Sequence, residues 1–219
     1  VAQNIITPQS NKPVMGIVQD SLLSAFMMTS PGVTLDKAEM CNIVMWVEGG
    51  ELPEPAYKQP NEAWTGLQCM SLLFPKDFNW RSQIVNGQLV SGPLGKKALG
   101  RSHGSIIHIL YNDYGPDRTC QFINELQRIN HLWFSTQGFS IGIGDMRITD
   151  ETAQKVRNEC ANVDNDAQTI RKEKGTDAEM YINRMLNQTR DSIGLIAQDA
   201  MKDDKTIFEV FSGGTEMME

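Results

Sequence analysis

Residues 7–23 read TPQSNKPVMGIVQDSLL, in which two prolines bracket a polar segment and regularly spaced apolar residues follow. Proline fixes its own φ and restricts the residue before it, so Gln9 to Lys12 are expected to be extended or in a turn. From Val14 onward the apolar residues recur every three or four positions, which predicts an amphipathic helix over residues 14–28. A polar loop therefore leads directly into an amphipathic helix.

Two further helices are marked by local signals downstream. The first is expected over residues 35–47, followed by residues 51–64, which hold three prolines and should be irregular. Thr65 and Gln68 then have the spacing of a capping box, in which a threonine side chain and a glutamine side chain each bind a backbone N–H group. This pattern predicts that a short helix begins after Thr65.

The Asn-Gly dipeptide at residues 86–87 lies between β-branched and aliphatic residues and predicts a hairpin with a type I′ turn. A glycine-punctuated loop that carries Lys96 and Lys97 is expected next. Two apolar helical patterns then lie on either side of Gly115, and the second should end at Gly138.

The composition changes after the glycine-laced segment around residue 144. Residues 150–172 and 177–202 are long, polar and compatible with helix, and the second carries only a thin apolar stripe. This pattern predicts an antiparallel helical hairpin. We therefore expect an α+β protein with a mixed α/β domain over residues 1–144 and a helical domain over residues 145–219.

The overall composition is that of an ordinary folded protein. Apolar residues make up 40% and charged residues 21% of the 219 residues. No apolar run approaches the roughly 18 residues that a membrane helix needs, and no signal-peptide pattern occurs. We therefore expect no membrane partner. The four cysteines are far apart and lack C-x-x-C spacing, which favours free thiols over a zinc site.

The charge is unevenly distributed along the chain. Residues 1–144 carry 10 basic and 11 acidic side chains, a net charge of −1, whereas residues 145–219 carry 10 basic and 16 acidic side chains, a net charge of −6. An acidic second half is poorly suited to binding a phosphate backbone directly. It suits a solvated helical surface that faces a protein partner.

No motif for catalysis or metal binding is present. The three histidines lack the spacing of a zinc hydrolase, the G-x-G sequence before Asp145 lacks the context of a nucleotide loop, and there is no nucleophile elbow or Walker loop. Lys96 and Lys97 are the exception, because paired lysines between glycines can present two ammonium groups to phosphates. The alternative is an ordinary exposed loop, and the same two readings apply to Gln9, Asn11 and Lys12.

Short motifs in a fixed order resemble the largest subunit of multisubunit DNA-dependent RNA polymerases of the RNA polymerase II type. They are PQSNKPVMGIVQD at residues 8–20, LPEPA at 52–56, WTGLQ at 64–68, NGQL at 86–89, KKALG at 96–100, GSIIH at 104–108, GFSIGIGD at 138–145 and LNQTRD at 186–191. One departure is Leu67, which stands where the family has a lysine. Several ordered matches over residues 7–191 are far more specific than any single one.

The resemblance implies the pore region of that subunit followed by the funnel helices, which line the secondary channel. In the family this channel admits nucleoside triphosphates, holds the extruded 3′ end of RNA and admits a transcript-cleavage factor. Carried over by position, Lys96 and Lys97 match paired lysines near the channel, and Arg190 matches a funnel arginine. Gln9, Asn11 and Lys12 match the segment close behind the active centre.

The resemblance also sets expectations for activity, partners and location. The family holds its catalytic magnesium on an aspartate-rich loop that has no counterpart in residues 1–219, so we expect no catalytic residue, metal ligand or cofactor here and an inactive fragment. The expected partners are the other polymerase subunits, with DNA reached only through the whole enzyme. The enzyme would act in the nucleus if cellular, or in host cytoplasm or virion if it comes from a large DNA virus. The alternative function is a protein-interaction module that docks a transcription factor through its acidic hairpin.

Overall fold

The computed structural model describes residues 2–140, 142–143, 148–174 and 178–200. Backbone contacts divide them into two units, one that ends at Phe139 and one that begins at Ser140. The boundary predicted near Gly144 lies outside the described residues and stays a prediction. The described part of the chain combines helices with small antiparallel sheets, which confirms the α+β class.

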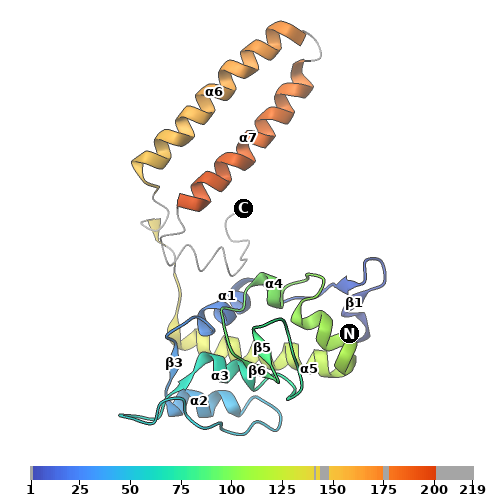
Figure 1. Cartoon of the computed structure of the whole chain (residues 1–219), viewed down its shortest axis with the longest axis vertical. Helices are drawn as coiled ribbons and strands as arrows, with labels where there is room; N and C mark the ends of the chain where they lie inside the picture. Colours follow the sequence, from blue (N-terminus) through green and yellow to red (C-terminus); the bar gives the residue numbers. More distant parts are fainter. Residues whose placement is uncertain (1, 141, 144–147, 175–177, 201–219) are drawn as a thin grey trace. The chain divides into compact units, whose positions relative to one another are not determined.

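The first unit contains five α-helices and three two-stranded antiparallel sheets (Figure 1). The helices are α1 (Gln19–Met28), α2 (Lys37–Val44), α3 (Gly66–Ser71), α4 (Lys96–Leu99) and α5 (Ile106–Gln137), preceded by a 3-10 turn at Ala2–Asn4. The sheets pair β1 (Ile6–Thr7) with β2 (Lys12–Pro13), β3 (Thr34–Leu35) with β4 (Trp64–Thr65), and β5 (Ile84–Val85) with β6 (Gln88–Leu89).

The two predicted turns at the strand pairs are present. Gln9 and its neighbours form the turn between β1 and β2, in which Asn11 has a φ of +45°. The Asn86-Gly87 turn joins β5 to β6 with φ values of +49° and +73°, the positive pair that a type I′ turn requires. The hairpin prediction is confirmed.

Helix α1 begins at Gln19, so the prediction that residues 14–18 are helical is wrong. The N–H group of Ile17 donates to the carbonyl of Leu99, 2.9 Å away, and the backbone of Gly16 lies against Gly100 and Arg101. These long-range contacts hold the segment in an extended path before the helix. Val14 and Val18 are consequently 51% and 53% exposed instead of forming an inner helical face.

Helices α2 and α3 are both closed at the start by capping boxes. The Asp36 side chain accepts from Glu39 N at 2.7 Å, and Thr65 and Gln68 make the reciprocal pair that the sequence predicted. Because Asp36 is the N-cap, α2 starts two residues later than expected and Leu35 belongs to β3.

Helix α5 joins the two helical segments that were expected around Gly115. Gly115 has a φ of +86° and Pro116 follows it, so the helix is kinked there. The helix ends at Gly138, whose φ is +69°, as predicted.

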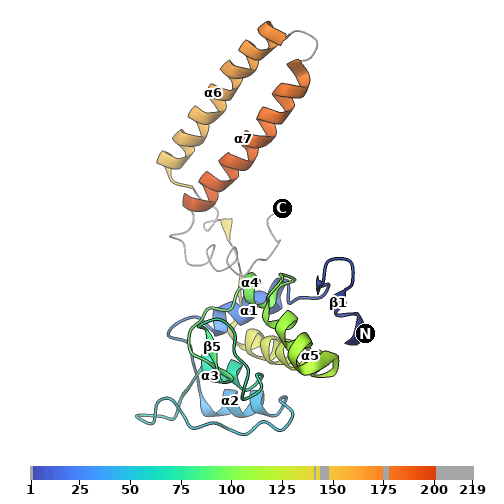
Figure 2. The ribbon, with the colours of Figure 1, turned by 45° about the vertical axis from the view of Figure 1, so that its right-hand side comes forward.

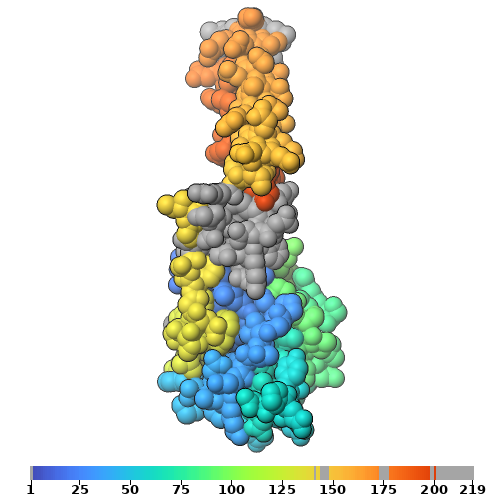
Figure 3. Space-filling model, turned by 90° about the vertical axis from the view of Figure 1, so that its left-hand side faces the viewer, coloured from blue at the N-terminus to red at the C-terminus, as the bar shows by residue number. Residues whose placement is uncertain are grey.

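Helix α1 packs against α5 through both apolar and polar contacts. Ser24 Oγ donates to the carbonyl of Asn130 at 3.0 Å, and Asn130 Nδ2 donates to the carbonyl of Ser21 at 2.9 Å. The space-filling view shows the C-terminal part of α5, in yellow, beside blue residues of the N-terminal segment (Figure 3). The buried aromatic core around these helices includes Trp64, Phe78, Trp80 and Phe122.

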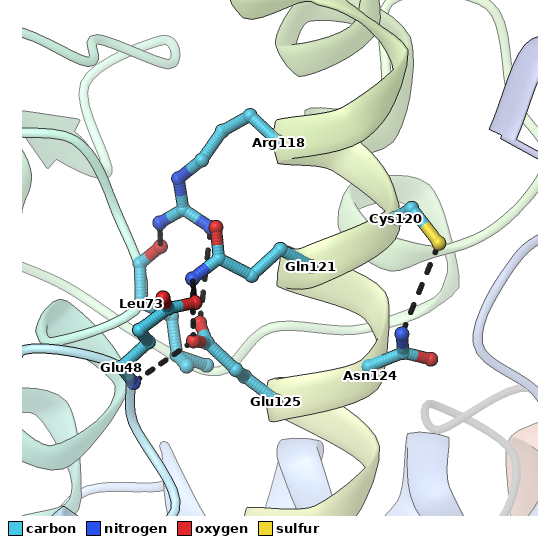
Figure 4. Close-up of polar contacts among 7 residues, drawn as sticks. All are labelled: Glu48, Leu73, Arg118, Cys120, Gln121, Asn124 and Glu125. Carbon is cyan, nitrogen blue, oxygen red and sulfur yellow. Dashed lines mark hydrogen bonds and ion pairs between the residues drawn. The ribbon is translucent and has the colours of Figure 1, made fainter.

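A polar cluster attaches the middle of α5 to the segment that follows α2 (Figure 4). The guanidinium of Arg118 donates to the carbonyl of Leu73 at 2.6 Å and lies 3.7 Å from the carboxylate of Glu125. Glu125 also accepts from the backbone N–H of Glu48 and from Gln121, at 3.0 and 2.9 Å. Glu125 is buried, so these donors compensate its desolvation.

The C-terminal end of α1 is enclosed by two glycines. A Cβ atom at Gly66 would meet the carbonyl oxygen of Met28, and one at Gly92 would meet the carbonyl oxygen of Thr29. The Thr29 hydroxyl donates to the carbonyl of Ala25 at 2.6 Å and accepts from the N–H of Leu94 at 2.8 Å. Segments distant in sequence therefore meet at one helix end.

The second unit is the expected antiparallel pair, α6 (Asp150–Lys174) and α7 (Ala178–Ala200), which lie side by side in both ribbon views (Figure 1 and Figure 2). The thin apolar stripe of α7, including Ile182, Leu186 and Ile193, faces a groove shared with α6. Thr176 and Glu179 have the sequence spacing of a capping box at the start of α7, but residue 176 lies outside the described residues, so this pairing stays a prediction. No described helix combines the length and apolar character needed to cross a bilayer.

Replacing Gly66 by alanine should lower the free energy of unfolding of the first unit by about 1–3 kcal/mol, because the new methyl group overlaps the Met28 carbonyl. Denaturant unfolding followed by tryptophan fluorescence measures this, since all four tryptophans belong to the first unit. Gly194→Ala is the control, because nothing lies within 4 Å of the added Cβ. An unchanged tryptophan transition in Gly66→Ala would contradict the packing argument.

Candidate functional site

The paired lysines line a pocket of about 900 Å³ in the first unit, called the lysine pocket below. Its wall is made by Phe26 of α1, by the segment around Trp80, by residues 91–95 and by α4. The lining residues are Phe26, Trp80, Arg81, Ser82, Gln83, Ser91, Pro93, Gly95, Lys96, Lys97, Ala98 and Ser102. A volume of this size is typical of small-ligand sites.

Lys96 and Lys97 form the first turn of α4, so the prediction that they belong to an irregular loop is wrong. Ala98 and Leu99 are buried and fix the short helix to the core, while both lysines are exposed. The helix lies next to α1 in both ribbon views (Figure 1 and Figure 2), consistent with the Ile17–Leu99 hydrogen bond. Burial of Ala98 and Leu99 thus anchors α4 and leaves the two lysine side chains in solvent.

A third cation, Arg81, lines the same pocket. Its guanidinium carbon lies 4.7 Å from the centroid of the Trp80 ring, a cation–π arrangement. Trp80 is buried, exchanges two backbone hydrogen bonds with Ile84, and donates from its indole N–H to the carbonyl of Gly104 at 2.9 Å. The ring that supports Arg81 is therefore rigidly held.

The pocket wall contains no carboxylate. Within the described residues, no acidic oxygen lies within 4.0 Å of a side-chain nitrogen of Arg81, Lys96 or Lys97. The remaining polar lining consists of three serines and Gln83, all of which can donate hydrogen bonds. Uncompensated cations beside neutral donors favour an anionic ligand.

The other predicted site residues lie elsewhere. Gln9, Asn11 and Lys12 are exposed on the β1–β2 hairpin and are not among the residues that line the lysine pocket. Arg190 belongs to the second unit, where it pairs with Asp191 at 2.9 Å and lines the groove between α6 and α7. Two of the six candidates therefore line the lysine pocket, three lie on the β1–β2 hairpin of the same unit, and Arg190 lies on α7 of the second unit.

Sequence reasoning missed Arg81 as a member of the site. Its neighbour Trp80 is the available signal, because an arginine next to a core tryptophan can stack on its exposed face. That signal becomes informative only when the burial of Trp80 is known.

Among the described residues, the histidines do not group with other side chains into a metal site. His103 and His108 stack edge to face with ring centroids 4.5 Å apart, and His108 Nδ1 accepts from the N–H of Gly104 at 3.0 Å. The third histidine, His131, is hydrogen-bonded to the Ser21 hydroxyl at 2.9 Å. In the described part of the chain no three His, Cys, Asp or Glu residues are grouped closely enough to hold a metal ion.

Burial changes the acid–base behaviour of two side chains in the first unit. It lowers the pKa of His108, and the nearby His103 lowers that pKa further. Burial also raises the pKa of the Cys69 thiol to about 12, so this thiol stays protonated near neutral pH and is a poor nucleophile.

Comparisons with known proteins give one consistent result. The family described as RNA polymerase Rpb1, domain 3, matches residues 4–146. Two curated relatives are the DNA-directed RNA polymerase II subunits RPB1-A and RPB1-B of Trypanosoma brucei brucei. Each is 34% identical over 170 residues, covering 71% of this chain and 10% of the relative. The chain spans about a tenth of the length of these relatives.

The free energy of unfolding should fall as the pH is lowered below about 6.5, the ordinary pKa of histidine in an unfolded chain. The folded pKa of His108 lies below that value, so the unfolded state binds a proton first and is favoured as pH falls. Urea titrations at several pH values measure the slope.

His108→Gln should remove this part of the slope, whereas His103→Gln should retain most of it because burial is the larger cause of the shift. An unaltered pH dependence in His108→Gln would refute the assignment.

Proposed function

Since the match to Rpb1 domain 3 and the identity to two RNA polymerase II subunits show that the chain belongs to the family of RNA polymerase largest subunits, we propose that it serves transcription within a DNA-directed RNA polymerase. The chain covers 10% of its curated relatives, so nucleotidyl transfer is an activity of the assembled complex. Its partners are the other subunits of that complex. In a cellular enzyme its place of action is the nucleus, and in a viral enzyme it is the host cytoplasm or the virion.

Within the complex the chain lines the secondary channel, with residues 1–144 as the pore and residues 145–219 as the funnel. The observation that carries this proposal is the lysine pocket, in which Arg81, Lys96 and Lys97 lie together without a carboxylate. Nucleoside triphosphates and RNA are polyanions, and such a pocket attracts their phosphates. The transcript-cleavage factor reaches the same channel.

The channel role is one of guidance. Lys96 and Lys97 raise the local concentration of phosphate-bearing ligands and hold them by charge, without forming or breaking a bond. Gln9, Asn11 and Lys12 form a polar edge on a separate hairpin, and Arg190 is engaged by Asp191. The lysine pair is therefore the strongest of the six candidates for contact with phosphate.

A second candidate function is docking of a transcription factor on the helical hairpin. The observation that favours it is apolar surface exposed on an otherwise acidic helical hairpin. Leu186 and Leu195 are 47% and 60% exposed, and the groove between α6 and α7 measures about 780 Å³. A contiguous apolar surface with a polar rim is typical of protein contacts, and the groove, lined by residues such as Val163, Ile182 and Leu186, supplies such a surface. In this case the hairpin binds a protein and the lysine pocket has no role in substrate passage.

Replacing Lys96 and Lys97 together by alanine in the assembled polymerase should weaken phosphate-dependent steps by about tenfold, as expected for the loss of two charge-assisted contacts. The measurements are the apparent KM for nucleotides and the rate of cleavage of extruded RNA. Lys58→Ala with Lys76→Ala is the control, because it changes net charge equally and neither lysine lines the pocket.

Unchanged kinetics in the Lys96/Lys97 variant, together with lost factor binding in Leu186→Asp with Leu195→Asp, would favour the docking function instead. Both exposed leucines can be replaced without opening the core of the first unit.

The isolated 219-residue chain should not incorporate nucleotides in the presence of magnesium. The aspartate-rich loop that holds magnesium in the family has no counterpart in its sequence, and we propose that the metal is held by other parts of the enzyme. A primer-extension assay with the purified chain tests this, with the assembled polymerase as the positive control. Magnesium-dependent extension by the chain alone would overturn the proposal.

A further inference from the structure

We propose that Arg81 is the third phosphate-binding cation of the lysine pocket, where its stacked guanidinium fixes a phosphate group that Lys96 and Lys97 attract. This inference rests on the proposed function, because it assigns a further residue to the same site. Arg81 lies outside all of the sequence motifs by which the chain resembles its family.

The first argument is the position of the side chain. Arg81 lines the lysine pocket together with both lysines, although it reaches the pocket from the segment before β5 and not from α4. The chain has 27 acidic and 20 basic residues, so carboxylates outnumber cations in the sequence as a whole. The pocket lining shows the reverse, with three cations and no carboxylate. The described residues supply no ion-pair partner for Arg81, so its charge is available to a ligand.

The second argument is the support beneath the guanidinium. The Trp80 ring holds it at 4.7 Å, and the hydrogen bond from the Trp80 indole to Gly104 fixes the ring in turn. Stacking restricts the rotamers of a long side chain but leaves the N–H groups free at the edge of the guanidinium plane. A fork held in this way can bind two oxygens of one phosphate through two parallel N–H groups, a fixed planar geometry that an ammonium group does not offer.

The third argument is the backbone at residue 81. Arg81 has a φ of +49°, a conformation that asparagine and glycine adopt more readily than arginine. Asparagine or glycine would therefore occupy this backbone position with less strain than arginine. Strained backbone positions of this kind cluster at functional sites, which agrees with a ligand-binding role for the Arg81 side chain.

The ligand chemistry is a phosphate group next to a flat or apolar moiety. Phe26 and Pro93 contribute apolar surface to the lining, and the serines and Gln83 contribute neutral donors. Two sources of phosphate reach the secondary channel in the proposed function: the triphosphate of an incoming nucleotide and the phosphodiester backbone of extruded RNA. The experiment has one arm for each source.

The variants are made in the assembled polymerase. Arg81→Gln removes the charge, Arg81→Asn removes it with a residue that tolerates the positive φ, and Arg81→Lys keeps the charge without the fork. Arg128→Gln is the matched control, because Arg128 is also exposed and stacked on a tryptophan, 5.6 Å from the Trp46 ring, but does not line the pocket. The Lys96/Lys97 double alanine variant is measured in parallel.

The first arm measures the apparent KM for nucleotide addition at several salt concentrations, and the second measures how fast complexes with extruded RNA return to elongation. Arg81→Gln and Arg81→Asn should change one of these by about threefold to tenfold, with Arg81→Lys in between and Arg128→Gln unchanged. For RNA, the slope of log affinity against log salt should also fall by about 0.7 for one lost phosphate contact. A change in KM identifies the nucleotide as the source, and a change in recovery identifies RNA.

Each remaining outcome overturns the inference in a distinct way. If the Lys96/Lys97 variant is impaired and both neutral Arg81 variants are normal, Arg81 binds no phosphate while the proposed function stands. If Arg81→Gln is impaired and Arg81→Asn is normal, the backbone and not the charge is responsible. If the lysine and arginine variants are all normal, the proposed function fails as well.

Discussion

The fold depends on close contact between backbone atoms at the C-terminal end of α1. Gly66 and Gly92 lie directly against the carbonyl groups of Met28 and Thr29, and the Thr29 hydroxyl accepts a hydrogen bond from Leu94. This contact brings β4, α3 and the segment before α4 to the same helix end. The lysine pocket follows from it, because Phe26 of α1 and Pro93 both belong to its wall. A side chain at either glycine would separate the elements that form the pocket.

Local signals in the sequence predicted the elements whose stability is itself local. The capping box at Thr65, the Asn86-Gly87 turn and the end of α5 at Gly138 involve residues within a few positions of each other, and all three are confirmed. The start of α1 was predicted wrongly, because Ile17 is bound to Leu99, far along the chain. Apolar spacing cannot distinguish a helix from an extended segment whose apolar residues meet different neighbours.

The candidate site could be predicted only in part. The type and pairing of Lys96 and Lys97 were visible in the sequence, and the ordered motifs identified the polymerase family, which the comparisons confirm. The membership of Arg81 was not visible, since it depends on the burial of Trp80 and on a pocket shared by four segments. Arg190 was assigned by resemblance to the funnel helices; it lies on α7 of the second unit, and its contact with a channel ligand stays a prediction.

The hydrogen bond from Ile17 to Leu99 has a mechanical consequence. It joins the extended segment after β2 to the last residue of α4, and Gly16 rests on the backbone just beyond that helix. Because α4 has only four residues, its orientation is set by such attachments and not by its own hydrogen bonds. The extended segment therefore fixes the end of α4 at the core, and the position of this end sets where the charges of Lys96 and Lys97 are presented.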